Sequence, residues 1–184
     1  HIIFDTAMPA IALYFESSMH RAGMSTGEIT KALFMVPVIY ATITFLSGFI
    51  ADKAGRKTTV TAFSLTCVAG YILFVVGILK GWNPYLVGSF AGLYQGSYWI
   101  GRDYMNVMMT EKVPTDIRAS VVGAEGLLVI IGLVIGYASI IVGMMLMQIW
   151  WACLAIAIPT VSVAAIIFTL KVKETKGANL DEIA

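Results

Sequence analysis

The chain has 184 residues, of which 59% are hydrophobic and 12% are charged, with a formal net charge of +1 and a mean hydropathy of +0.85. So few charged side chains cannot cover a soluble globule of this size, and the small net charge gives no basis for binding nucleic acid. We therefore expect an all-α integral membrane protein whose first partner is the lipid bilayer.

Six apolar segments follow one another along the chain, separated by short connections that hold most of the charges. A bilayer core about 30 Å thick needs roughly 20 apolar residues per helix. A turn near Gly143 to Gln148 must divide the last apolar stretch, because one helix over residues 119–170 would be more than twice as long as the bilayer is thick. We expect six transmembrane helices at about residues 1–19, 29–51, 58–79, 84–110, 119–142 and 146–170, followed by a tail of residues 171–184.

The first segment begins at His1, with no basic stretch before the apolar residues, so no signal peptide is visible and we expect the sequence to be a fragment. It contains one carboxylate at an intramembrane position, Asp5. The second segment ends in Gly48-Phe-Ile-Ala-Asp52-Lys-Ala-Gly55-Arg56-Lys57. There Gly48 allows a neighbouring helix to approach closely and Gly55 permits a tight turn, while Asp52 is able to face a cation or the positive end of another helix.

The fourth segment contains Arg102, roughly 13 Å along the helix from Glu111, which places it near the middle of the bilayer. Helical spacing puts it in one stripe with four other polar or aromatic residues, Gln95, Tyr98, Trp99 and Asn106. We expect this stripe to face a cavity and bind the substrate, with Arg102 contacting an anionic or strongly polar group. The alternative is a structural Arg102 that is neutralised by Asp5 or Asp103, and Tyr98 and Trp99 are equally well explained as packing aromatics.

Three carboxylates are candidates for coupling to protons, because burial in a low dielectric favours the protonated form. Asp5 has the best position near the midplane. Glu125 shares a face with Gly132 and Gly136, so a structural hydrogen bond to the adjacent helix is at least as good an explanation. Asp103 continues a ridge of small residues, Gly88, Gly92 and Gly96, and an ion pair or hydrogen bond with a neighbouring helix is its better interpretation.

The basic residues are concentrated on one side of the expected helices. That side is predicted to be cytoplasmic, because short cytoplasmic loops carry an excess of Lys and Arg. We expect a multi-pass protein of the plasma (inner) membrane with its tail in the cytoplasm. The basic residues on this side are Lys53, Arg56, Lys57, Lys112, Arg118, Lys171, Lys173 and Lys176.

Three motifs in this order resemble a known family. The stretch from Gly48 to Lys57, the connection Glu111-Lys-Val-Pro-Thr-Asp-Ile-Arg118-Ala119 and the tail Glu174-Thr-Lys-Gly-Ala-Asn-Leu-Asp-Glu-Ile183 resemble the corresponding connections of the major facilitator superfamily of secondary transporters. The tail is similar to that of sugar porters and related metabolite:proton symporters, although Lys173 stands where that tail has Pro. The resemblance implies that residues 1–184 are the C-terminal half of a twelve-helix transporter, whose N-terminal six-helix half is absent from this sequence.

The resemblance also implies a function. We expect secondary active transport of a small polar organic solute, a sugar or an organic acid, coupled to protons and working by alternating access. It further implies that Asp52, Arg56, Glu111 and Arg118 form a cytoplasmic charge network that opens with the inner gate. The alternative for the basic residues Arg56, Lys57 and Lys112 is simple anchoring at lipid headgroups.

No catalytic constellation is present in the sequence, so we expect neither an enzyme nor a cofactor. Cys67 and Cys153 lack the spacing of a metal or redox motif, and no metal site is expected. A non-transporting membrane receptor or scaffold with the same fold is the alternative function, and a membrane enzyme is weaker still.

Overall fold

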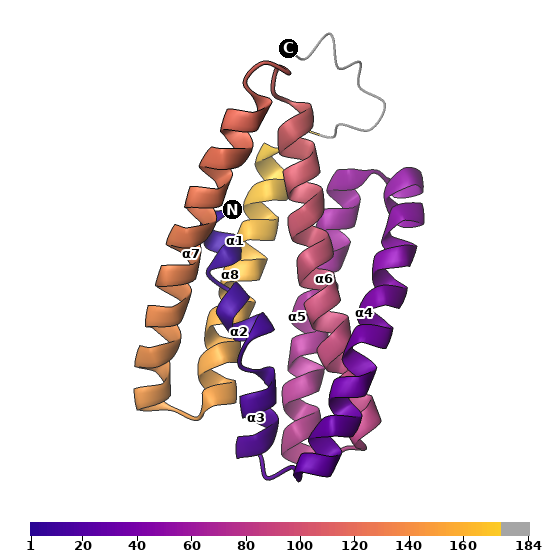
Figure 1. Cartoon of the computed structure of the whole chain (residues 1–184), viewed down its shortest axis with the longest axis vertical. Coiled ribbons are helices and arrows are strands. Elements are labelled where there is room, and N and C mark those ends of the chain that lie inside the picture. Colours follow the sequence, from indigo (N-terminus) through magenta and orange to yellow (C-terminus); the bar gives the residue numbers. More distant parts are fainter. Residues whose placement is uncertain (174–184) are drawn as a thin grey trace.

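The computed structural model describes residues 1–173, and the regular structure in that range is entirely helical. The expectation of an all-α chain is therefore confirmed for this part of the protein. Five long helices run along the molecule, and three short ones form an interrupted segment beside them (Figure 1). The helices are α1 (Ile2–Asp5), α2 (Met8–Ala12), α3 (Phe15–Arg21), α4 (Thr26–Ala54), α5 (Arg56–Lys80), α6 (Pro84–Glu111), α7 (Arg118–Leu146) and α8 (Ile149–Lys171).

Local sequence signals set the ends of the long helices. Before α4, the Glu28 N–H donates to the Ser25 hydroxyl at 3.4 Å and the Ser25 N–H donates to the Glu28 carboxylate at 2.8 Å, which is a capping box. Gly55 separates α4 from α5 with a φ of 90°, a backbone conformation that favours glycine. The tight turn predicted at Gly55 is confirmed, and so is the break near Gly143 to Gln148, because α7 ends at Leu146.

The first segment differs from the continuous helix expected over residues 1–19. Pro9 has no N–H to donate to the carbonyl of Asp5, and its ring crowds that carbonyl. Helix α1 accordingly ends at Asp5, and α2 begins at Met8 with Pro9 in its first turn. A second break between Ala12 and Phe15 separates α2 from α3.

Side chains of the neighbouring helices donate hydrogen bonds to backbone carbonyls next to this second break. The Tyr71 hydroxyl of α5 donates to the carbonyl of Ala10, and Gln95 Nε2 of α6 donates to the carbonyl of Ile11, both at 3.3 Å. Buried carbonyls need such partners when the helical N–H groups are lost. The interrupted segment is therefore fastened to α5 and α6 by hydrogen bonds that only the tertiary fold supplies.

Glycines allow two close helix contacts. A Cβ atom at Gly92 would lie 2.6 Å from the carbonyl oxygen of Val36, so the predicted close-packing ridge on α6 is confirmed against α4. On α7, a Cβ at Gly132 would lie 2.8 Å from the carbonyl oxygen of Ile2, which brings α7 against the interrupted segment. The Gly48 position is different, because a Cβ there would meet nothing within 4 Å among the described residues. The expected close approach at Gly48 is therefore wrong for contacts within this bundle.

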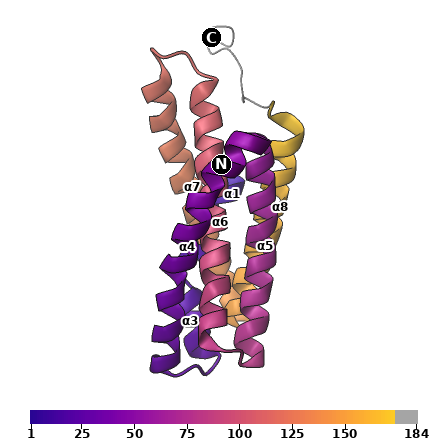
Figure 2. The same ribbon diagram turned by 90° about the vertical axis from the view of Figure 1, so that its right-hand side faces the viewer.

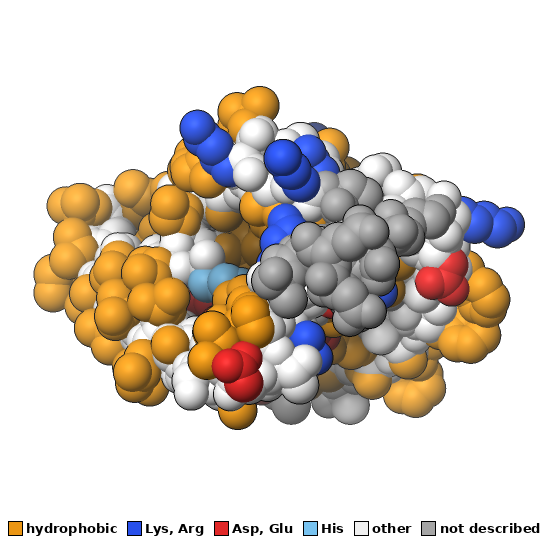
Figure 3. All heavy atoms as spheres, turned by 90° about the horizontal axis from the view of Figure 1, so that it is seen from above, with side chains coloured by type: hydrophobic (Ala, Val, Ile, Leu, Met, Phe, Trp, Pro, Cys, Tyr) orange, Lys and Arg blue, Asp and Glu red, His pale blue; other side chains and the backbone are white. Residues whose placement is uncertain are grey.

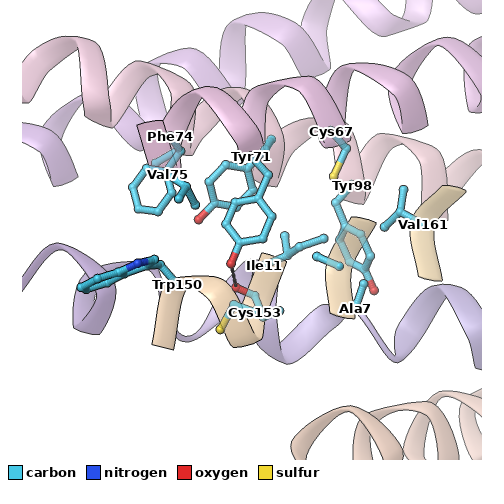
Figure 4. Packing of buried hydrophobic residues seen from close by; sticks show 14 of the residues in the cluster. Ala7, Ile11, Cys67, Tyr71, Phe74, Val75, Tyr98, Trp150, Cys153 and Val161 are labelled. Atoms are coloured by element: carbon cyan, nitrogen blue, oxygen red, sulfur yellow. Dashed lines mark hydrogen bonds between the residues drawn. The ribbon is translucent and has the colours of Figure 1, made fainter. Parts of the chain in front are cut away.

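Aromatic side chains fill the centre of the bundle. Helix α6 lies between α4 and α5, as Figures 1 and 2 show. The ring centroids of Tyr71 and Tyr94 are 4.6 Å apart, and those of Phe74 and Tyr94 are 5.4 Å apart. Figure 4 shows this core reaching Cys153 on α8; Cys153 and Cys67 are both free and buried.

Four of the helices, α4, α5, α7 and α8, are long and apolar enough to cross a membrane. Their outward side chains are apolar as well: Phe45 is 70% exposed and Leu127 is 65% exposed. These surfaces fit a multi-pass membrane protein, because lipid is the solvent that such side chains tolerate. Helix α6 carries the polar stripe and the first segment is interrupted, so six crossings stay a prediction from the sequence.

The connection between α4 and α5, that between α6 and α7, and the end of α8 lie at one end of the molecule, at the top of Figure 1. Figure 3 shows this end, with Lys and Arg side chains gathered on it. It is the end for which the sequence predicts a cytoplasmic location. The tail motif of residues 174–183 lies outside the described residues.

Candidate functional site

Asp5 is the centre of a buried charge cluster. Its side chain is fully buried at the end of α1, where Pro9 interrupts the helix. Arg102 Nε of α6 donates to Asp5 Oδ1 at 2.8 Å, and the Tyr98 hydroxyl donates to the same oxygen at 3.1 Å. The structure therefore pairs Arg102 with Asp5, one of the two carboxylates, Asp5 and Asp103, that the sequence offered as partners of a structural Arg102.

Glu125 brings a third helix to the cluster. It is 8% exposed on α7, and its Oε1 lies 3.5 Å from Arg102 Nη2. Gly132, two turns further along α7, lets this helix lie against the interrupted segment that carries Asp5. One guanidinium thus joins α1, α6 and α7, and it compensates one of the two carboxylate charges.

Two aromatic residues hold the cluster in position. The Tyr98 ring is fully buried and stacks on Phe4 with centroids 4.8 Å apart. The Arg102 guanidinium lies 5.6 Å from the centroid of the Trp99 ring, a distance at which a cation–π contact is favourable. Tyr98 is therefore a core residue that orients Asp5, and Trp99 contacts Arg102 directly.

The other two residues of the predicted stripe also point inward. Gln95 is engaged with the carbonyl of Ile11, as described above. Asn106 is half-buried, and its carbonyl oxygen is buried without a hydrogen bond to any residue between 1 and 173. Asn106 consequently keeps an acceptor that a ligand or water could use.

Asp103 lies apart from the cluster. It is exposed on a different face of α6 from Arg102, because adjacent residues of a helix point about 100° apart around its axis. The structure brings it to neither Asp5 nor Glu125, which are its fellow candidates for proton coupling.

His1 completes the cluster, and the sequence did not single it out. Its Nδ1 lies 3.9 Å from Asp5 Oδ2 and 3.6 Å from Glu125 Oε1. The spacing of four residues between His1 and Asp5 is the signal that indicates a shared helix face. That signal is weak by itself, because Glu125 comes from more than a hundred residues away.

A second candidate site lies at the basic end of the molecule, where part of the predicted cytoplasmic charge network is formed. Arg56, at the start of α5, makes an ion pair with Glu111 at the end of α6. The Arg118 guanidinium donates to the backbone carbonyl of Val113 at 3.3 Å. Asp52 is exposed in the last turn of α4, and Lys57 is half-buried in the first turn of α5. The Arg56–Glu111 pair ties the ends of two helices together on the basic face.

No protein-family model matches this chain, and a search of curated proteins finds no relative.

Proposed function

We propose that this chain is the C-terminal six-helix half of a major facilitator secondary transporter that moves a small polar organic solute together with protons. The observation that carries the proposal is the buried cluster of Asp5, Arg102 and Glu125, held where the interrupted segment meets two long helices, α6 and α7. The motifs of residues 48–57 and 111–119 support the choice of family.

Charged side chains inside a membrane bundle are costly and therefore point to a function. A charged side chain at the centre of a membrane helix costs roughly 2.5–3.5 kcal/mol on an insertion scale, so such residues are kept at pathways and relays. Interrupted helices are tolerated at membrane depth where neighbouring groups satisfy the freed backbone, and transporters use them to build sites near the midplane. Both features meet at Asp5 in this protein.

The proposed mechanism follows from the shared oxygen of Asp5. Oδ1 accepts from both Arg102 and Tyr98 while Asp5 is charged. A proton on Asp5 removes the closer of the two carboxylate charges beside the guanidinium, and Arg102 is then able to bind an anionic or polar group of the solute. Loss of the proton restores the ion pair and displaces the solute, which couples the two movements.

Two features of the chain bear on the class of solute, and they favour different classes. The tail of residues 174–183 favours a sugar, and the guanidinium of Arg102 favours an organic acid. The transport path forms between this bundle and an N-terminal six-helix half in the complete protein, in the plasma membrane, with no chemical change to the solute.

The test is uptake of labelled sugars and organic acids by vesicles that contain the complete gene product, with and without an inward proton gradient. Accumulation of one class only when the gradient is present supports proton-coupled transport and chooses the solute class. Equilibration without accumulation contradicts proton coupling. If no solute moves while ligand or partner binding persists, a receptor or scaffold replaces the transporter.

A further inference from the structure

Three buried atoms converge beside Asp5 without hydrogen-bond partners among the described residues. They are His1 Nδ1, Asp5 Oδ2 and Glu125 Oε1, and they all lie within 4.8 Å of one another. The side chain of Asp5 is fully buried, and those of Glu125 and His1 are 9% and 13% exposed. Unsatisfied polar atoms in such a place are costly, and three aimed at one point indicate a missing partner.

The charge balance says what kind of partner is missing. Asp5 and Glu125 bring two negative charges and Arg102 brings one positive charge, so the cluster has an excess charge of −1 when His1 is neutral. An uncompensated charge in a buried site is strongly unfavourable. The partner is therefore a cation.

We propose that His1, Asp5 and Glu125 bind a divalent transition-metal ion of the Zn²⁺ or Mn²⁺ kind. One imidazole and two carboxylates are ligands that these ions accept, whereas Mg²⁺ and Ca²⁺ prefer oxygen alone. Two bonds of about 2.1 Å at a tetrahedral angle separate their ligand atoms by about 3.4 Å. In the structure His1 Nδ1 lies 3.6 Å from Glu125 Oε1 and 3.9 Å from Asp5 Oδ2. Small side-chain movements would shorten both distances to the spacing of metal ligands.

The surroundings of Asp5 are those of a metal ligand. Arg102 and Tyr98 both donate to Oδ1 and leave Oδ2 directed at His1. Groups that hydrogen-bond to one oxygen of a carboxylate fix the direction of its second oxygen. Metal ligands in proteins are oriented in this way. Arg102 Nη2 is 3.5 Å from Glu125 Oε1, which is too long for a strong hydrogen bond and leaves that oxygen available.

A pocket begins beside His1, one of the three proposed ligands. It has a volume of about 410 Å³, and His1 is part of its lining. It continues past Met105, Met108 and Met109 to Lys112 and Lys171, which lie at the ends of α6 and α8 on the basic face. The pocket thus extends from His1 toward the predicted cytoplasmic side, and Asp5 and Glu125 lie beyond its lining.

The experiment is Zn²⁺ binding by the complete gene product purified in detergent, measured by calorimetry at neutral pH. We expect His1→Gln and Glu125→Gln each to weaken Zn²⁺ binding about 10-fold or more. His20→Gln and Asp103→Asn are the matched controls, because both residues are exposed and outside the cluster, and they should bind as the unmodified protein does. The inference does not require transport, and these measurements include none.

A second readout uses the unmodified protein and the exposed control variant, so it does not depend on how well the cluster variants fold. Cu²⁺ bound to the unmodified protein should show coupling to an imidazole nitrogen in pulsed electron paramagnetic resonance, and this coupling should persist in His20→Gln. The inference is overturned if the protein binds no Zn²⁺, if both cluster variants keep full affinity, or if the nitrogen coupling is absent or disappears in His20→Gln.

Discussion

The side chains of Asp5 and Arg102 depend on each other more than on any other partner. Arg102 reaches across from α6 to a carboxylate that is fully buried, and its guanidinium lies over the Trp99 ring. Removing one member of such a pair leaves an uncompensated buried charge, which costs far more than the pair contributes to stability. Single substitutions here should therefore affect stability as well as function, and the experiments need to separate the two.

The first prediction concerns Asp5→Asn. The amide keeps the size of the side chain and still accepts hydrogen bonds, but it cannot bind and release a proton. We expect accumulation driven by a proton gradient to be lost in vesicles, while exchange of solute across the membrane continues. Asp103→Asn is the control, since this exposed carboxylate should be replaceable. Accumulation by Asp5→Asn that responds to pH as before would remove Asp5 from the coupling mechanism.

The second prediction concerns Arg102→Gln and its rescue. The single substitution leaves Asp5 and Glu125 without the guanidinium beside them, so we expect a loss of stability of about 3–5 kcal/mol and a loss of solute affinity. The double variant Arg102→Gln with Asp5→Asn removes one charge of each sign, and stability should return without solute binding. Chemical unfolding in detergent and equilibrium solute binding measure the two effects. Solute affinity that survives in the double variant would contradict a binding role for Arg102.

The helices themselves are held by close backbone contacts. Gly92 on α6 leaves no room for a side chain opposite Val36, whereas Gly126 on α7 has nothing within 4 Å of its would-be Cβ among the described residues. The two glycines share a helical setting and differ in their surroundings. They make a matched pair for testing how much the contact between α4 and α6 contributes.

The third prediction follows from this pair. Gly92→Ala should destabilise the protein by about 1–3 kcal/mol, because the new methyl group forces α4 and α6 apart. Gly126→Ala should cause no loss, since alanine is the better helix former and its methyl group points into open space. Unfolding of both variants in denaturant, followed by tryptophan fluorescence, gives the comparison. Equal stability of the two would mean that α4 and α6 do not depend on close packing at Gly92.

Much of this helical arrangement follows from the sequence, and the exceptions have physical causes. Apolar segment lengths place α4 to α8 to within a few residues, because each helix needs only its own sequence and its connections. The break between Ala12 and Phe15 was not predicted, since the backbone carbonyls beside it accept hydrogen bonds from Tyr71 and Gln95 of distant helices. His1 was missed for the same reason, as Glu125 reaches it only through the tertiary fold.

The bundle has two parts, which are joined by the packing of α5 against α8 and by the charge cluster. Helices α4, α5 and α6 pack closely, and α7 and α8 pack with the interrupted segment (Figure 1). Direct packing between α6 and α7 is slight, so the contact of Arg102 with Glu125 is one of the few that joins them. A change of charge at this cluster is therefore well placed to alter how the two parts fit together.

The basic end of the molecule offers a separate test of movement. Arg56 and Glu111 are paired there, and their side chains are 33% and 18% exposed. An ion pair in such a setting contributes about 0.2–1 kcal/mol, which shifts an equilibrium between closed and open ends by about 1.4- to 5-fold. Met108, nearby on α6 and 1% exposed, lines the pocket beside these helix ends, and we expect its exposure to rise when the ends separate.

The fourth prediction uses a cysteine at Met108 to report this opening. Glu111→Gln should raise its rate of labelling by a membrane-impermeant maleimide about 1.4- to 5-fold in vesicles that expose the basic face, because the closed end loses its ion pair. The charge exchange Arg56→Glu with Glu111→Arg should restore the slow rate, since the same two positions attract again. The buried Cys67 and Cys153 supply the background rate. If Glu111→Gln and the exchanged pair both label at the original rate, the pair anchors the helix ends without controlling access. Labelling that rises in both would instead show that Glu111 acts through its position and not through its attraction to Arg56.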